Sequence, residues 1–333
     1  MKHKNIAIFV PHAGCPHRCS FCDQHAITSH AALPRAADVT RICAQAFRDI
    51  PDRHSTQVAF FGGSFTGLPR ACLCELLEAV QPFLGPDGFA GVRISTRPDC
   101  IDAEILALLR HYRVTAIELG AQSMRDRVLL ANRRGHTAQD VEHAASLIRE
   151  NGFELGLQVM LGLYGSSMED ERETGRRIRA LCPDTVRLYP VAVLRGTQLA
   201  ALYEAGAYPL FSFDEVIELT AAELLQYHGA GIRVIKCGLH ASEVVERDLV
   251  AGFYHPAFRE LCESRIYLRR MQALCGGAGG RRVTFAVHPS CISKAAGHKR
   301  CNLLALRTQS GCDVRIRPDA SLGPYQVKIV QEE

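Results

Sequence analysis

Residues 14–22 read Gly-Cys-Pro-His-Arg-Cys-Ser-Phe-Cys and place Cys15, Cys19 and Cys22 within eight residues, directly after the short apolar run 5–10. Three residues separate the first pair of cysteines and two separate the second pair. Cysteine runs with such short gaps are typical of iron–sulfur sites, because thiolates on one loop can converge on a single cluster. Three thiolates for the four irons of a [4Fe–4S] cluster leave one iron open, as a catalytic metal site requires.

A structural zinc site is the alternative interpretation of the same cysteines. Protein zinc sites hold four ligands, and three nearby histidines, His12, His17 and His25, could supply the fourth. The spacing alone leaves both metals open.

The composition is that of a soluble globular chain. It has 333 residues with 47% hydrophobic and 22% charged residues, which excludes general disorder. The apolar run 5–10 is too short for a secretory signal, and no apolar stretch approaches the length of a membrane span. The 14 cysteines are therefore expected to stay reduced in the cytoplasm rather than to form a disulfide framework.

Short apolar runs alternate with amphipathic segments along the first 230 residues. The expected strands are 5–10, 57–61, 91–95, 115–119, 154–160 and 185–193. The expected helices are 37–49, 69–83, 101–112, 138–151, 168–181 and 213–228. Six strand–helix units in series predict an α/β fold with a parallel sheet, and six units are too few for a closed eight-unit barrel. We therefore expect an open, partial (β/α)6 barrel.

The rhythm changes after residue 230. A helix is expected at 255–274, a flexible glycine loop at 276–280, and short strands with turns at 281–330. We expect a barrel domain at 1–230 and a small α+β extension at 231–333.

Residues 264–317 hold eleven lysines and arginines but one acidic residue, although the whole chain carries a net charge of only +4. Such a segment attracts phosphates, which predicts an RNA-binding surface with loop 298–302 as a contact. The alternatives are a solvated surface offset by acidic helices, or a small anionic substrate.

Polar and glycine-rich motifs follow the expected strands, at 60–69, 95–99, 118–123 and 134–137. The carboxyl ends of parallel strands form one edge, where active sites of such folds gather. Gly62 and Gly63 would let the backbone approach a ligand closely. Glu118 is expected to be buried and paired with a basic residue.

Together these motifs resemble the radical S-adenosylmethionine (SAM) superfamily over about residues 5–230, and within it the radical SAM domain of the elongator catalytic subunit, which modifies wobble uridines of tRNA. Phe21 is the aromatic residue commonly found before the third cysteine. The resemblance implies a [4Fe–4S] cluster on Cys15, Cys19 and Cys22, with SAM on the open iron. It also implies reductive cleavage of SAM to a 5′-deoxyadenosyl radical, with electrons from a flavodoxin- or ferredoxin-type donor.

The resemblance also assigns candidate SAM contacts. The glycine motif would receive the SAM amino group, and the superfamily usually has an acidic residue where this chain has Ser64. Arg97 or Arg134 could neutralise the methionine carboxylate. Ser95, Gln122 and Ser123 are candidates for the SAM ribose and carboxylate, and Gln158 could contact ribose or adenine.

Residues 189–197, 202–206 and 252–261 look like the C-terminal extension of a bacterial subgroup of elongator-like proteins. Too few residues follow 264 for an acetyltransferase domain, so wobble-uridine carboxymethylation by this chain alone is not expected. The leading interpretation is a radical SAM enzyme that modifies RNA, with tRNA as the favoured substrate.

Two other functions remain open at this point. One is a radical SAM oxidoreductase for a small molecule, as in the oxygen-independent coproporphyrinogen dehydrogenases, which tend to carry a further cysteine where this chain has Gln24. The other is a non-catalytic protein that binds zinc and RNA. The eleven other cysteines are expected mainly to pack as small hydrophobic residues.

Overall fold

The computed structural model describes residues 4–10, 14–16, 19–22, 33–275, 282–311 and 313–332. The chain forms two compact units, residues 1–210 with 232–253 and residues 211–231 with 254–333. The units interleave, whereas the sequence suggested one boundary near residue 230. Helix α9 (Phe213–Gly229) packs on α11 (Phe258–Cys275) in the second unit, and the strand that follows α9 returns to the sheet of the first.

The first unit is built on a seven-stranded parallel sheet in the order β1-β2-β3-β4-β5-β6-β8. Its strands are β1 (Lys4–Val10), β2 (Thr56–Gly62), β3 (Val92–Thr96), β4 (Val114–Gln122), β5 (Glu154–Leu161), β6 (Thr185–Pro190) and β8 (Arg233–Cys237). The α/β class and the open parallel barrel are confirmed, with β8 as a seventh strand that the sequence did not reveal. The expected strand 185–193 ends at residue 190, because β7 (Ala192–Leu194) pairs with β9 (Leu249–Gly252) instead.

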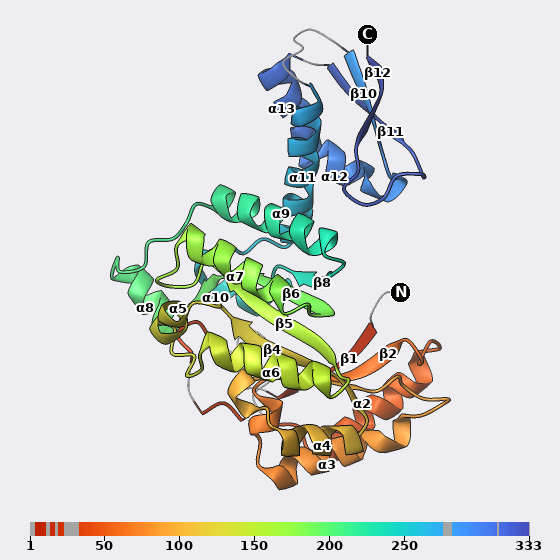
Figure 1. Ribbon diagram of the computed structural model, residues 1–333, viewed down its shortest axis with the longest axis vertical. Helices are drawn as coiled ribbons and strands as arrows, with labels where there is room; N and C mark the ends of the chain where they lie inside the picture. Colours follow the sequence, from red (N-terminus) through yellow and green to blue (C-terminus); the bar gives the residue numbers. More distant parts are fainter. Residues whose placement is uncertain are drawn as a thin grey trace. The chain divides into compact units, whose positions relative to one another are not determined.

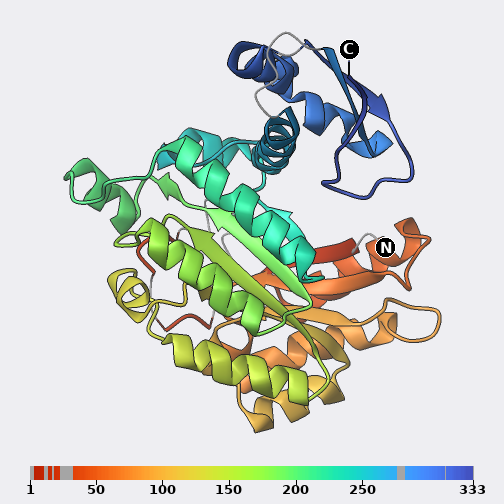
Figure 2. The ribbon, with the colours of Figure 1, turned by 45° about the horizontal axis from the view of Figure 1, so that its top comes forward.

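Helices run between the strands and cover one face of the sheet (Figures 1 and 2). The covering helices are α2 (Ala36–Asp49), α3 (Arg70–Val80), α4 (Ala103–His111), α6 (Ala138–Glu150) and α7 (Met168–Ala180). The unit also contains the short helices α5 (Asp126–Ala131), α8 (Gln198–Glu204) and α10 (Glu243–Asp248). Ile94, Ile117, Leu155 and Val186 are fully buried and belong to one face of the sheet. Since side chains alternate along a strand, their neighbours in sequence belong to the opposite face, which we call the inner face.

The inner face is polar. Arg93 of β3, Glu118 of β4 and Arg187 of β6 form one ion-paired group, in which Glu118 binds Arg93 at 3.1 Å and Arg187 at 2.7 Å. Gly156 lies opposite Glu118 on β5, and a Cβ there would stand 2.7 Å from the Glu118 Cγ. The expected burial and pairing of Glu118 is therefore confirmed, and Gly156 makes the space for its side chain.

The second unit combines α9 and α11 with a three-stranded sheet in the order β11-β10-β12. Its further elements are β10 (Arg282–Val287), α12 (Ile292–Ala296), α13 (Cys301–Ser310), β11 (Asp313–Pro318) and β12 (Lys328–Glu332). The sequence predicted only strands and turns across 281–330. Helix α13 was missed because Asn302 and Leu306 are its only buried described side chains, which leaves a weak amphipathic pattern.

Candidate active site at the carboxyl edge of the sheet

The cysteine loop lies against the glycine-rich loop that follows β2. Gly63 N donates to the Val10 carbonyl at 2.6 Å, which ties the second loop to the end of β1. A Cβ on Gly14 would overlap the Ser64 carbonyl, and a Cβ on Gly67 would overlap the Gly14 carbonyl. The two motifs therefore touch backbone to backbone, and only glycine permits this approach.

The second half of the cysteine loop is held from both sides. Ser20 donates its Oγ to the Asn132 Oδ1 at 2.7 Å and its N to the Asn132 carbonyl at 3.2 Å. Leu199 N donates to the Ser20 carbonyl at 2.9 Å. Cys22 N donates to the Cys19 carbonyl, so these two cysteines flank one turn. The backbone of the turn is thus fixed by residues far away in the sequence.

The three thiols are free. Cys19 is buried, while Cys15 and Cys22 are half-buried. Burial raises the pKa of the Cys15 thiol, opposed by a hydrogen bond from the backbone of Ser64 and by the charges of Arg134 and Arg97. The alternative zinc ligands His12, His17 and His25 lie outside the described residues.

Two buried arginines lie near this loop, and their partners differ. Arg97 donates Nε and Nη2 to Asp99, both at 2.9 Å, so its charge is balanced by a bidentate carboxylate. Arg134 donates Nη1 to the Cys19 Sγ at 3.0 Å and Nη2 to the Gly120 carbonyl at 2.8 Å, and its Nε has no described partner. Arg134 is therefore the arginine with unused hydrogen-bonding capacity at this edge.

Gln122 and Gln158 meet where β4 and β5 end. Gln158 Nε2 donates to the Gln122 Oε1 at 3.3 Å. Gln122 has a φ of 64°, in the left-handed region that glutamine rarely adopts, beside an irregularity in the β4–β5 register. Strain of this kind is often held at functional sites. Both amides are thus available at the sheet edge.

The other predicted SAM contacts differ in their burial and in their hydrogen bonds to neighbouring residues. Ser95 is half-buried on β3, and Phe21 is half-buried in the cysteine turn. Ser64 is buried, with its Oγ 2.9 Å from the Thr96 Oγ1 and 3.3 Å from the Arg97 N. Ser123 is buried beside α7, with its Oγ 3.3 Å from the Thr174 Oγ1. A SAM contact by each of these residues stays a prediction.

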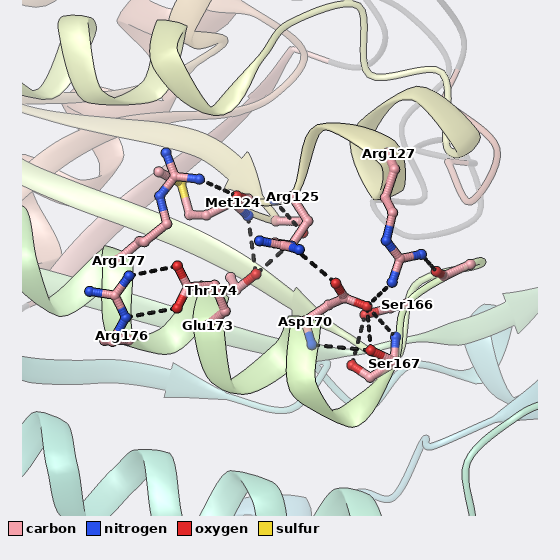
Figure 3. Close-up of polar contacts among 12 residues, drawn as sticks. Met124, Arg125, Arg127, Ser166, Ser167, Asp170, Glu173, Thr174, Arg176 and Arg177 are labelled. Atoms are coloured by element: carbon pink, nitrogen blue, oxygen red, sulfur yellow. Dashed lines mark hydrogen bonds and ion pairs between the residues drawn. The ribbon is translucent and has the colours of Figure 1, made fainter.

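Helix α7 fixes the segment that follows Ser123 (Figure 3). Met124 N donates to the Thr174 Oγ1 at 3.1 Å, and Arg177 Nη1 donates to the Met124 carbonyl at 2.6 Å. Asp170 caps the helix with Ser167 and also binds both Arg125 and Arg127. Sequence reasoning missed Thr174, because one threonine in an amphipathic helix carries no signal of such a contact.

His136 is a further buried group that sequence reasoning did not single out. Its Nε2 lies 3.3 Å from the Ala121 carbonyl, and its Nδ1 has no described partner. Burial, followed by the charge of Arg134, lowers the pKa of His136 to about 4. His136 is therefore a neutral imidazole near Arg134, and its Nδ1 has no described hydrogen-bond partner.

Comparison with known proteins decides the family. Residues 9–178, half of the chain, match the radical SAM superfamily, and residues 183–268 match the Radical_SAM C-terminal domain. The chain belongs to the radical SAM superfamily. Members of this superfamily are enzymes that use a [4Fe–4S] cluster and SAM, and the cofactors expected from the sequence are those of the family.

The similar proteins of this radical SAM chain include tRNA-modifying enzymes. The chain is 29% identical over 238 residues to the tRNA uridine(34) acetyltransferase of Dehalococcoides mccartyi. This alignment covers 61% of this chain and 52% of that protein. It is 30% identical over 184 residues to human Elongator complex protein 3, over 53% of this chain and 32% of that protein. It is also 32% identical to the uncharacterized protein MJ0486 of Methanocaldococcus jannaschii, over 49% of this chain and 51% of that protein.

Solved structures share the fold at low sequence identity. The Elp3 of Methanocaldococcus infernus aligns with a TM-score of 0.58 at 18% identity, over 81% of this chain and 63% of that one. Methylornithine synthase aligns with a TM-score of 0.51 at 14% identity, over 82% of both chains. The radical SAM chain spans about half the length of the first curated relatives it matches.

The residues at the carboxyl edge fit the family's cofactors. Free thiols on one loop supply the donors, the facing glycines bring a second loop close, and buried nitrogens of Arg134 and His136 remain open for a ligand. Across the described ranges, no three Cys, His, Asp or Glu side chains already stand together as a metal site. This holds both for the triplet and for the described cysteines of the second unit.

Of the remaining described cysteines, five are buried as expected: Cys43, Cys237, Cys262, Cys275 and Cys291. Cys182 and Cys301 are exposed, and the others are half-buried. No helix within the described part of the chain is long and apolar enough to cross a membrane.

Proposed function

We propose that this radical SAM chain binds a [4Fe–4S] cluster through Cys15, Cys19 and Cys22 and uses it to modify RNA, with tRNA as the favoured substrate. When bound, the cluster supplies one electron, which breaks the sulfur–C5′ bond of SAM to leave methionine and a 5′-deoxyadenosyl radical. The observation that carries the proposal is the contact of the cysteine loop with the glycine motif at the strand ends, in a chain that matches the superfamily.

The chain's own residues would position SAM. Gly62 and Gly63 lie against Val10 at the end of β1, just before the cysteine loop, and their backbone would contact the SAM amino group. Ser95, Gln122 and Gln158 present polar groups at neighbouring strand ends, suited to ribose or adenine. Since Asp99 already balances Arg97, its guanidinium is less suited to bind the methionine carboxylate.

RNA as substrate is supported by the relatives and by the second unit. Part of its basic charge is offset: Arg265 and Arg269 bind Glu218 of α9, and Lys294 binds Glu263. Six other described cations of segment 264–317 are exposed and have no described acidic partner: Arg270, Lys299, Arg300, Arg307, Arg315 and Arg317. A surface with this excess of positive charge favours a polyanion over a small neutral substrate.

The test is anaerobic reconstitution of the full chain with iron and sulfide, followed by dithionite and SAM. We expect a brown protein that produces 5′-deoxyadenosine, with both properties lost in Cys19→Ala and retained in the control Cys182→Ala, whose thiol is exposed. A colourless protein that ignores SAM would support the zinc alternative instead.

The substrate class needs a separate experiment. Anaerobic pull-down with the full chain, nuclease digestion and mass spectrometry of the nucleosides should recover tRNA. A 5′-deoxyadenosine-producing enzyme that recovers no RNA would contradict the RNA proposal. It would favour a radical oxidoreductase for a small molecule.

A further inference from the structure

Arg134 lies in the connection between α5 and α6, and its guanidinium is directed at a proposed cluster ligand. The side chain is buried, with 6% of the residue exposed. Nη1 donates to the Cys19 Sγ at 3.0 Å, and Nη2 donates to the Gly120 carbonyl at 2.8 Å. The second bond anchors the planar fork on β4, so the first has a fixed direction toward the sulfur.

The charge of Arg134 has no carboxylate to balance it. No ion pair of Arg134 occurs among the described residues, whereas the neighbouring Arg97 is bound by both oxygens of Asp99. Cys19 is the group of opposite charge that Arg134 contacts when the thiol is ionised. A cation with no other counterion acts strongly in a buried environment, because little water screens it.

Hydrogen bonds to ligand sulfurs and nearby charges set the reduction potentials of iron–sulfur clusters. Reduction adds one electron to the cluster, so a fixed positive charge and an N–H donor at the ligand favour the reduced state. We propose that Arg134 is a positioning residue that raises the reduction potential of the cluster through its N–H···S bond to Cys19. The electron comes from a low-potential external donor, and no covalent bond forms or breaks.

The test is a redox titration, monitored by electron paramagnetic resonance, of the reconstituted full chain without SAM. In Arg134→Gln we expect reduction to become at least tenfold less favourable, which is a fall of about 59 mV in the midpoint potential. Arg134→Lys keeps the charge but loses the fork, and should show a smaller fall. The matched control is Arg133→Gln, which removes the same charge from the exposed neighbouring residue.

An unchanged potential in Arg134→Gln, or a fall no larger than in Arg133→Gln, would overturn the inference. If Arg134→Gln takes up too little iron to titrate, Arg134→Lys decides, and an unchanged potential there has the same meaning. If Arg134 instead binds the SAM carboxylate, its variants weaken SAM binding while the SAM-free potential stays constant, which also overturns the inference.

The inference rests on the proposed cluster ligation, and the two failures are distinguishable. Wrong ligands would show as a Cys19→Ala variant with full iron and sulfide content. A wrong role for Arg134 would show as a normal cluster with a normal potential.

Discussion

Glu118 lies at the centre of the charged group on the inner face of the sheet. Arg93 is fully buried, and it binds Glu118 together with the Oε1 of Gln57. Arg187 binds both oxygens of Glu118 and lies 4.9 Å over the ring of Phe61. Glu118 thus binds two arginines that are largely shielded from water, and Arg93 also binds Glu154 at 2.8 Å.

Glu118→Gln should therefore be strongly destabilising. It keeps the shape of the side chain but leaves Arg187 without a described carboxylate partner and Arg93 with Glu154 alone, and breaking a buried ion pair costs about 3–5 kcal/mol. The free energy of unfolding in urea measures it. The control Glu173→Gln removes a carboxylate that binds Arg176 at the surface of α7, and should cost much less than Glu118→Gln because water screens this pair. Equal losses in both variants would contradict this account.

His136 makes the stability of the fold depend on pH. Burial lowers its pKa to about 4 in the folded protein, against about 6.5 in the unfolded chain. Because the unfolded chain takes up a proton first, the contribution of His136 is complete above about pH 6.5 and is lost as the pH falls toward 4. Arg134 and Arg97 disfavour the proton, and Asp99 opposes them.

Between about pH 7.5 and pH 5 this group should lower the free energy of unfolding by about 2 kcal/mol. Urea unfolding of the wild type and of His136→Asn at both pH values measures the difference. The variant should lose that part of the pH dependence. An identical pH dependence in the two proteins would refute the assignment.

At the scale of elements, the first half of α7 supports the loop that leaves β4. The helix begins with a capping box between Ser167 and Asp170. One turn later, Thr174 accepts a hydrogen bond from the backbone of Met124. This loop carries Ser123 and leads to α5. Helix α7 therefore holds in place the loop that follows β4 at the candidate site (Figure 3).

Thr174→Val should loosen this connection. The change keeps the volume but leaves the buried Met124 N–H without an acceptor, which costs about 1–3 kcal/mol. The control Thr174→Ser keeps the hydroxyl and should lose less. Hydrogen exchange of the Met124 amide, together with urea unfolding, measures both variants. Equal protection of that amide in Thr174→Val and the wild type would show that this hydrogen bond does not stabilise the loop.

At the scale of the whole molecule, charge is distributed unevenly and partly cancelled. Acidic residues of α9 offset the arginines of α11 that face them within the second unit. Arg315 and Arg317 alternate along the edge strand β11, so both belong to the same face, and both are exposed. These two arginines keep their charge available for phosphates.

Replacing both arginines with glutamine should weaken RNA binding about tenfold and reduce its dependence on salt. Each lost phosphate contact lowers the slope of log K against log salt by about 0.7–0.9. Filter binding or fluorescence anisotropy with tRNA across a salt series measures both effects. The control is Arg265→Gln with Arg269→Gln, whose charges are already paired. If both double variants weaken binding equally, local pairing does not decide which cations bind RNA.

The sequence was sufficient to predict the parallel α/β fold, the strand-end motifs, the cysteine triplet and the burial of Glu118. These follow from local patterns, since the period of apolar residues and the spacing of glycines and cysteines are read within a few residues. Even the segment after residue 230 could be recognised by its change of secondary-structure rhythm. The sequence did not reveal that the two units interleave. Strand β8 returns to the first sheet after α9 has joined the second unit, and no local pattern shows this.

Which charges meet depends on how the chain folds in three dimensions. Arg134 and Cys19 are 115 residues apart in sequence, and Glu118 and Arg187 are 69 apart. Arg97 and Arg134 look alike in the sequence, but one is neutralised by Asp99 and the other faces a thiol. Electrostatic interactions depend on distance in space and on burial, and neither quantity is present in the order of residues until the strands are paired.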